Sequence, residues 1–102
     1  MLVFKFGGAS VKSAEAVKNI VEILKPYKKE NIVVVVSAMG KTTNAIERII
    51  DYYAAGKTEK LEQEYHALKG YHLEVVNGLF EDKGHEVFAA VEELFKDCLL
   101  YT

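Results

Sequence analysis

The sequence is poor in cysteine, proline and tryptophan, and it has no large excess of one charge. Its 102 residues include a single cysteine, Cys98, which has no partner for an internal disulfide or a metal site. We therefore expect a reducing, cytoplasmic environment. The 13 basic and 15 acidic residues leave a formal net charge of −2. This balance offers no basic face, so nucleic acid is not expected as a general partner.

Long apolar runs are also missing. No run approaches the roughly 20 residues that span a membrane, and the first residues lack the order of a signal peptide. We therefore expect no membrane partner. The last residues, 95–102, remain apolar and periodic, which favours a chain cut from a longer protein.

The apolar residues that are present predict a β-α-β unit in the first part of the chain. Leu2–Phe6 reads as a short strand, and a helix is expected from Ser13 to the region of Pro26. Ile32–Val36 consists of five consecutive β-branched residues, which is typical of a strand covered on both faces in a parallel sheet. The crossover between the two strands is expected to be right-handed.

The remainder of the chain predicts helices. Asn44, with Glu47 three residues later, could form a capping box at the start of a helix that Gly56 ends. A long helix is expected from Thr58, and a break at 82–84 separates it from a last helix. The sequence thus predicts an α/β fold with two parallel strands and a predominantly helical remainder, divided into residues 1–56 and a helical pair at 57–102. Two strands alone make a poor sheet, so the chain either borrows strands or begins a larger domain.

Two loops, residues 7–12 and 37–43, leave the carboxyl ends of the predicted strands, where open α/β sheets bind ligands. In the first loop Gly7, Gly8 and Ser10 precede a helix, so backbone N–H groups could receive a phosphate. Lys5 lies just before the glycines and could offset the charge of that phosphate. The alternative is that the glycines make a tight turn and that Lys5 lies on a solvated edge.

The second loop contains Gly40-Lys41-Thr42, but it is not a P-loop. That motif needs a glycine five residues before Gly40, where this chain has Val35 inside the strand. The loop does offer polar groups that could hold a small carboxylate or simply cap the following helix: Ser37, Thr42, Thr43 and Asn44. His66 and His72 are six residues apart and match no metal-binding pattern, so no metal site is expected.

Together the two loops resemble the signatures of a known family. KFGGASV, residues 5–11, is similar to the K-F-G-G-T-S-V segment that opens aspartate kinases of the amino acid kinase family. VSAMGKTTN, residues 36–44, resembles that family's second loop, V-S-A-M-G-x-T-T-[DN]. The resemblance covers residues 2–50, and the family's order of the motifs is kept. One departure is Ala9, which stands where the signature has threonine.

This resemblance implies an activity and a set of site residues. Aspartate kinases transfer a phosphoryl group from MgATP to the side-chain carboxylate of L-aspartate, the first step towards lysine, threonine and methionine. Carried over by position, the ATP phosphates would meet Lys5, Gly7, Gly8 and Ser10, with Lys5 stabilising the transferring group. The aspartate would be bordered by Ser37 and Ala38 and bound by Thr43.

The resemblance also implies that this chain is incomplete. A whole aspartate kinase domain is more than twice as long, and its later part supplies further substrate and adenine contacts. We therefore expect the N-terminal part of a truncated three-layer amino acid kinase-like fold, catalytically inactive by itself, with no ligand bound tightly. The alternatives are another kinase of the family, acting on acetylglutamate or uridylate, and a non-catalytic helical module. A homodimer could form through the exposed edge of the second strand or through the helices.

Overall fold

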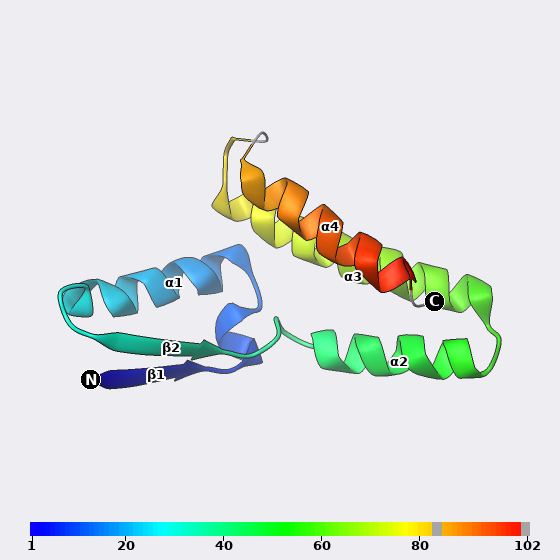
Figure 1. Cartoon of the computed structure of the whole chain (residues 1–102), viewed down its shortest axis with the longest axis horizontal. Helices are drawn as coiled ribbons and strands as arrows, with labels where there is room; N and C mark the ends of the chain where they lie inside the picture. Colours follow the sequence, from blue (N-terminus) through cyan, green and yellow to red (C-terminus); the bar gives the residue numbers. More distant parts are fainter. Residues whose placement is uncertain (83–84, 101–102) are drawn as a thin grey trace. The chain divides into compact units, whose positions relative to one another are not determined.

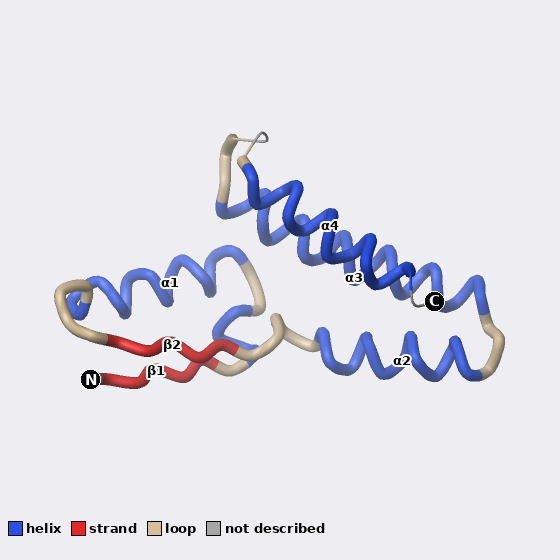
Figure 2. Tube along the Cα trace, viewed as in Figure 1, coloured by secondary structure: helices blue, strands red, loops and turns tan. Residues whose placement is uncertain are grey.

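The computed structural model describes residues 1–82 and 85–100, with side chains described through Asp97. Part of the predicted break at 82–84 and the side chain of Cys98 lie outside the described residues. Figures 1 and 2 show the order of the elements, which is β1 (Leu2–Phe6), η1 (Gly8–Val11), α1 (Ala14–Leu24), η2 (Lys25–Tyr27), β2 (Ile32–Val36), α2 (Thr42–Ala54), α3 (Thr58–Leu79) and α4 (Glu86–Leu100). The predicted fold class is confirmed, because two parallel strands are followed by a mainly helical chain.

The chain forms two compact units, residues 1–42 and 43–102, and each is described by itself. The boundary falls at the start of α2, whereas the division predicted from the types of element falls after Gly56. The first unit contains both strands, α1 and the two loops of the predicted site. The second unit contains nearly all of α2, together with α3 and α4.

In the first unit β1 and β2 pair in parallel, with Leu2 opposite Ile32 and Phe6 opposite Val36. The core consists of Phe6, Val11 and Ile20, with partly buried apolar residues packed around it: Phe4, Val17, Leu24 and Met39. Successive side chains of a strand point to opposite faces. Because Phe4 and Phe6 face this core, Lys5 lies on the opposite face of the sheet.

The expectation that β2 is covered on both faces is wrong for this chain. Residues 33–36 are 39% to 57% exposed. The reason is that α1 packs on one face only, and the described sheet has two strands, so each strand keeps an open edge. Lys5 is exposed as well, so its ammonium group carries none of the desolvation cost that burial in a strand would impose.

Local hydrogen bonds explain where the helices begin and end. The Ser13 hydroxyl accepts a hydrogen bond from the Ala16 N–H at 3.1 Å, which confirms the predicted N-cap of α1. The predicted capping box at Asn44 is wrong, because the Thr42 N–H already donates to the Met39 carbonyl at 3.0 Å and α2 begins at Thr42. Gly56 follows the end of α2 with a φ of +71°, as a C-terminal glycine should.

In the second unit α3 and α4 pack side by side (Figure 1). The two helices run in opposite directions, because Tyr65 of α3 contacts Phe95 of α4 whereas the later Lys69 contacts the earlier Glu92. The Tyr65 ring also lies edge-on to the Phe95 ring, with centroids 5.9 Å apart. The buried residues of α3 are Leu61, Tyr65, Val75 and Val76. The predicted long helix from Thr58 and the predicted helical pair are therefore confirmed.

Candidate functional site

The two loops at the carboxyl ends of β1 and β2 are joined by backbone hydrogen bonds. The Ser37 N–H donates to the Phe6 carbonyl, and the Gly40 N–H donates to the Gly8 carbonyl, both at 3.0 Å. The first bond continues the parallel ladder beyond β2, and the second ties the tips of the loops together. The structure thus brings the glycine pair next to the Ser37–Ala38 segment, as the topology of a parallel sheet predicts.

Gly8 and Gly40 allow this close approach for different reasons. A Cβ atom at Gly8 would lie 2.8 Å from the Gly40 carbonyl oxygen and 3.1 Å from the Ala38 carbonyl oxygen. Gly40 has a φ of +52°, in the left-handed region that favours glycine. Gly7 differs from both, since a Cβ atom there would have nothing within 4 Å. Gly8 and Gly40 are therefore needed for the loop contact, and Gly7 is not.

The glycine pair does not lead directly into α1. The short helix η1 intervenes, and the Ser10 N–H donates to the Gly7 carbonyl at 3.0 Å. The first turn of α1 is capped by its own Ser13. The N-terminus of α1 therefore does not contribute to anion binding at this loop. Any anion binding by the loop depends on its backbone N–H groups and on Lys5.

Lys5 is exposed on the face of the sheet opposite α1 and lies beside Val35 in the register. Within the described part of the chain it takes part in no ion pair. Lys5 is the last residue of β1 before Phe6, and the glycine pair follows directly. Lys5 is therefore solvated, as the alternative interpretation of the first loop expects, and its contact with a phosphate stays a prediction.

The predicted substrate side of the site is open. Ser37 and Ala38 are exposed in the loop that follows β2. Thr43 is also exposed, but it lies in α2 and belongs to the second unit. The structure therefore brings Gly7, Gly8, Ser37 and Ala38 together within the first unit, and the role of Thr43 stays a prediction.

Sequence reasoning missed Thr42 as a structural residue of the loop. Its side chain is 7% exposed, and its hydroxyl donates a hydrogen bond to the Met39 carbonyl. This bond closes the turn that carries Gly40 and fixes the start of α2. Sequence analysis offered Thr42 either to a small carboxylate or to a helix cap, and neither interpretation included a bond back to Met39 within the loop.

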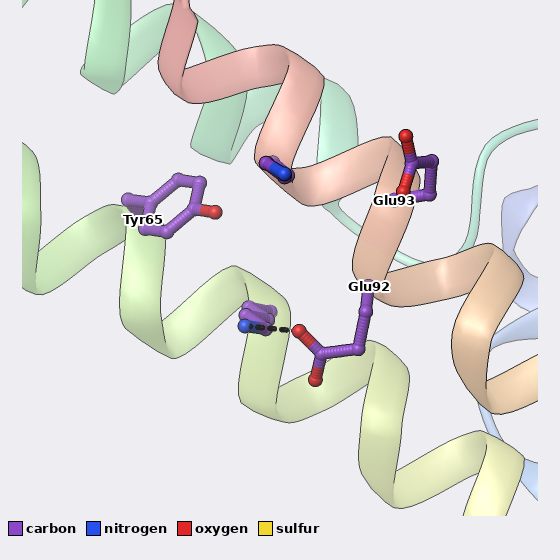
Figure 3. A pocket seen from close by; sticks show the side chains of 5 residues that line it. Tyr65, Glu92 and Glu93 are labelled. Atoms are coloured by element: carbon purple, nitrogen blue, oxygen red, sulfur yellow. Dashed lines mark ion pairs between the residues drawn. The ribbon is translucent and has the colours of Figure 1, made fainter.

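A pocket on the second unit shows that charged residues also gather outside the loops. It lies on the α3–α4 pair and is lined by Tyr65, Lys69, Glu92, Glu93 and Lys96. Figure 3 shows Glu92 reaching from α4 towards α3, where it pairs with Lys69 at 2.7 Å. The hydrogen bond with Glu92 raises the pKa of Lys69. These charges stabilise the helix pair, and none of the predicted site residues lies among them.

The described residues form neither a metal site nor a membrane-spanning helix. Among the described side chains, residues 1–82 and 85–97, no three histidine or acidic groups gather closely enough to hold a metal ion. Over the same residues, no helix has the length and apolar character needed to cross a bilayer. The loops of residues 7–12 and 37–43 contain no carboxylate that could bind Mg²⁺.

The sequence matches a known family. The chain belongs to the amino acid kinase family, whose model matches residues 1–96. Among its relatives, Aspartokinase 1, chloroplastic, of Arabidopsis thaliana is 34% identical over 96 residues, which is 90% of this chain and 16% of that protein. Aspartokinase 2, chloroplastic, of the same plant is 50% identical over 44 residues, or 43% of this chain and 8% of that protein. The predicted resemblance to aspartate kinases is therefore confirmed, and the chain spans about a sixth of the length of Aspartokinase 1.

Proposed function

We propose that this chain supplies the phosphate loop and the acceptor loop of a kinase that phosphorylates the side-chain carboxylate of L-aspartate with MgATP. The carrying observation is the hydrogen bond from the Gly40 N–H to the Gly8 carbonyl, which places the two loops against each other. A transferring phosphoryl group must lie between donor and acceptor within a few ångströms. Two loops that touch at their tips satisfy this requirement.

Each proposed residue has a separate task in this reaction. A carboxylate oxygen of aspartate forms a bond to the γ-phosphorus, the bond from that phosphorus to the β,γ-bridging oxygen breaks, and ADP leaves. Lys5 and the N–H groups of Gly7 and Gly8 offset the negative charge that gathers on the phosphoryl oxygens. Ser10 contributes a further contact to the phosphates. On the acceptor side, Ser37 and Ala38 border the aspartate and Thr43 binds it.

Mg²⁺ enters this proposal with the nucleotide and not as a bound cofactor of the chain. It neutralises charge on the ATP phosphates when it is bound. We further propose that the chain alone does not turn over, because residues 1–102 correspond to only 16% of Aspartokinase 1. The cytoplasmic location is likewise a proposal, drawn from the scarcity of cysteine; the relatives named above are described as chloroplastic.

A titration of the isotope-labelled chain with MgATP, followed through its backbone amide signals, tests the phosphate loop without requiring turnover. We expect the largest shifts at Gly7, Gly8 and Ser10. Lys5→Met should weaken the binding about tenfold or more, because it removes a charge-assisted contact to phosphate. The matched control is Lys18→Met on α1, whose exposed lysine lies outside the loops.

Acceptor choice is tested next, with L-aspartate, acetylglutamate and uridylate added separately to the MgATP-loaded chain. Of the three acceptors, only L-aspartate should shift the amide signals of Ser37, Ala38 and Thr43. If only acetylglutamate or uridylate shifts these signals, that compound replaces L-aspartate as the proposed acceptor. The proposed phosphate-binding role of the first loop would be unaffected. Equal effects of the Lys5 and Lys18 substitutions, or ATP shifts confined to residues outside both loops, would overturn the proposal as a whole.

A further inference from the structure

Lys41 lies at the tip of the second loop, in a turn that the structure holds in place. The Thr42 N–H donates to the Met39 carbonyl at 3.0 Å, so residues 39–42 form a tight turn with Gly40 and Lys41 at its centre. Gly40 has the positive φ of this turn, +52°, and no non-glycine residue of the described chain has one. The Met39 side chain packs against the core of the first unit. The backbone of Lys41 is therefore fixed on both sides, whereas its side chain is exposed.

This turn contacts the glycine pair of the first loop. The Gly40 N–H donates to the Gly8 carbonyl at 3.0 Å, and the Gly40 carbonyl oxygen would lie 2.8 Å from a Cβ atom at Gly8. The nitrogen of Lys41 is bonded to that carbonyl group, so the backbone of Lys41 begins beside Gly8. A lysine side chain is a flexible four-carbon stem with a compact charge at its end. The Lys41 ammonium group can therefore reach an anion that is held by the N–H groups of Gly7 and Gly8.

The charges of the two loops favour an anion at this contact. Residues 7–12 and 37–43 contain two lysines, Lys12 and Lys41, and no acidic residue. Lys12 follows η1 at the far end of the first loop, whereas Lys41 directly follows the residue that touches Gly8. Among the described residues, no acidic side chain forms an ion pair with Lys41. A positive charge that no carboxylate neutralises attracts phosphate, and lysine binds phosphate oxygens through charge-assisted hydrogen bonds.

We propose that the Lys41 ammonium group binds the γ-phosphoryl group of ATP from the acceptor side of the loop contact. This inference rests on the proposed function, in which the first loop holds the donor phosphates and the second loop borders the acceptor. Of the three phosphates, only the γ-phosphoryl group passes from the first loop towards the second, so a cation on the second loop meets this group. Lys41 donates hydrogen bonds to its nonbridging oxygens and keeps its own protons. Meanwhile the bond from the γ-phosphorus to the β,γ-bridging oxygen breaks, the bond to the aspartate carboxylate oxygen forms, and ADP leaves.

A comparison of MgATP with MgADP tests this proposal, because the two nucleotides differ in the γ-phosphoryl group. Each is titrated into the isotope-labelled full chain, and its dissociation constant is read from the amide signals of Gly7 and Gly8. We expect Lys41→Met to raise the dissociation constant of MgATP about tenfold and that of MgADP less than about twofold. Lys41→Arg keeps the charge and should restore most of the lost MgATP binding. Lys18→Met, on α1, is the matched control and should change neither constant.

Equal losses of MgATP and MgADP binding in Lys41→Met overturn the proposal, and so does a loss no larger than that of Lys18→Met. The side-chain Cε–H signal of Lys41 in the unaltered chain gives a second readout that needs no variant. It should shift with MgATP and stay in place with MgADP. Equal shifts with both nucleotides, or no shift, contradict the contact even if a variant fails to fold.

The same titrations separate this inference from the proposed function. If Lys5→Met weakens MgATP binding and Lys41→Met does not, the role of Lys41 is wrong and the proposed phosphate loop is unaffected. If MgATP shifts neither Gly7 nor Gly8 in the unaltered chain, both proposals are overturned together.

Discussion

The two compact units keep their shape by different means. In residues 1–42 the loops are held by backbone groups, with N–H to C=O bonds from Ser37 to Phe6 and from Gly40 to Gly8. In residues 43–102 side chains hold the helices, as in the bond from the Tyr65 hydroxyl to the Phe95 carbonyl at 2.8 Å. The loop contact therefore depends on the positions of the glycines. The helix pair depends instead on the side chains that connect α3 and α4.

Ala9 illustrates this difference within the family signature. It replaces the threonine of the aspartate kinase motif, and it is exposed. Neither backbone bond between the loops involves it. A side-chain change at this position therefore leaves the frame of the loops intact, whereas a similar change at Gly8 would not.

The largest expected effect comes from Gly8→Ala. The new methyl group would lie 2.8 Å from the Gly40 carbonyl oxygen, so backbone must shift, at a cost of about 1–3 kcal/mol typical of overpacking. Thermal and denaturant unfolding would measure the loss. Faster hydrogen exchange of the Gly40 amide would locate it.

Gly7→Ala is the control for this substitution. Gly7 has a φ of −78° and a ψ of 176°, which alanine adopts without strain. We expect no loss, or a gain of about 0.4–1 kcal/mol from the less flexible unfolded chain. If the two substitutions destabilise the chain equally, the close approach of the loops is not what makes Gly8 necessary.

An intermediate effect is expected from Tyr65→Phe, which removes one side-chain hydrogen bond between α3 and α4. It removes the hydroxyl that donates to the Phe95 carbonyl and keeps the ring contact. We expect a loss of about 1 kcal/mol in the free energy of unfolding, the usual net value of one hydrogen bond. Tyr53→Phe, at a tyrosine that is 59% exposed, should change little. A null result at Tyr65 would mean that this hydrogen bond does not stabilise the helix pair.

Much of the fold could be predicted because its signals are local. The β-branched run of Ile32–Val36 gave β2, and Ser13 and Gly56 marked helix ends through bonds to near neighbours. The start of α2 was mispredicted because Asn44 and Glu47 fit a capping box, while the bond from Thr42 to Met39 starts the helix earlier. Two local motifs competed there, and the sequence alone does not rank them.

The site was harder to predict because it depends on residues far apart in the chain. Two adjacent glycines look alike in the sequence, and only the carbonyls of Ala38 and Gly40 distinguish Gly8 from Gly7. The exposure of the faces of β2 was not predicted, because five consecutive β-branched residues are typical of a strand covered on both faces, whereas α1 covers only one. The face on which Lys5 lies was derivable, since Phe4 and Phe6 belong to one apolar face by alternation.

The smallest effect is expected from Lys69→Met, which breaks the ion pair with Glu92 but leaves the helix pair's apolar contacts. The hydrogen bond with Glu92 raises the pKa of Lys69, so the pair contributes stability below the ordinary lysine pKa of 10.5 and loses it as the pH rises through the higher folded-state value. Between pH 6 and about 9 the variant should therefore differ from the unaltered chain by a constant amount, smaller than the effect of Tyr65→Phe. Lys96→Met, in the same pocket, is the control.

Salt separates the charge of Lys69 from the packing of its side chain. Because exposed ion pairs are screened, the difference in stability between Lys69→Met and the unaltered chain should shrink at about 1 M salt. A difference that persists at this salt concentration would assign the effect to packing of the lysine stem and not to its charge.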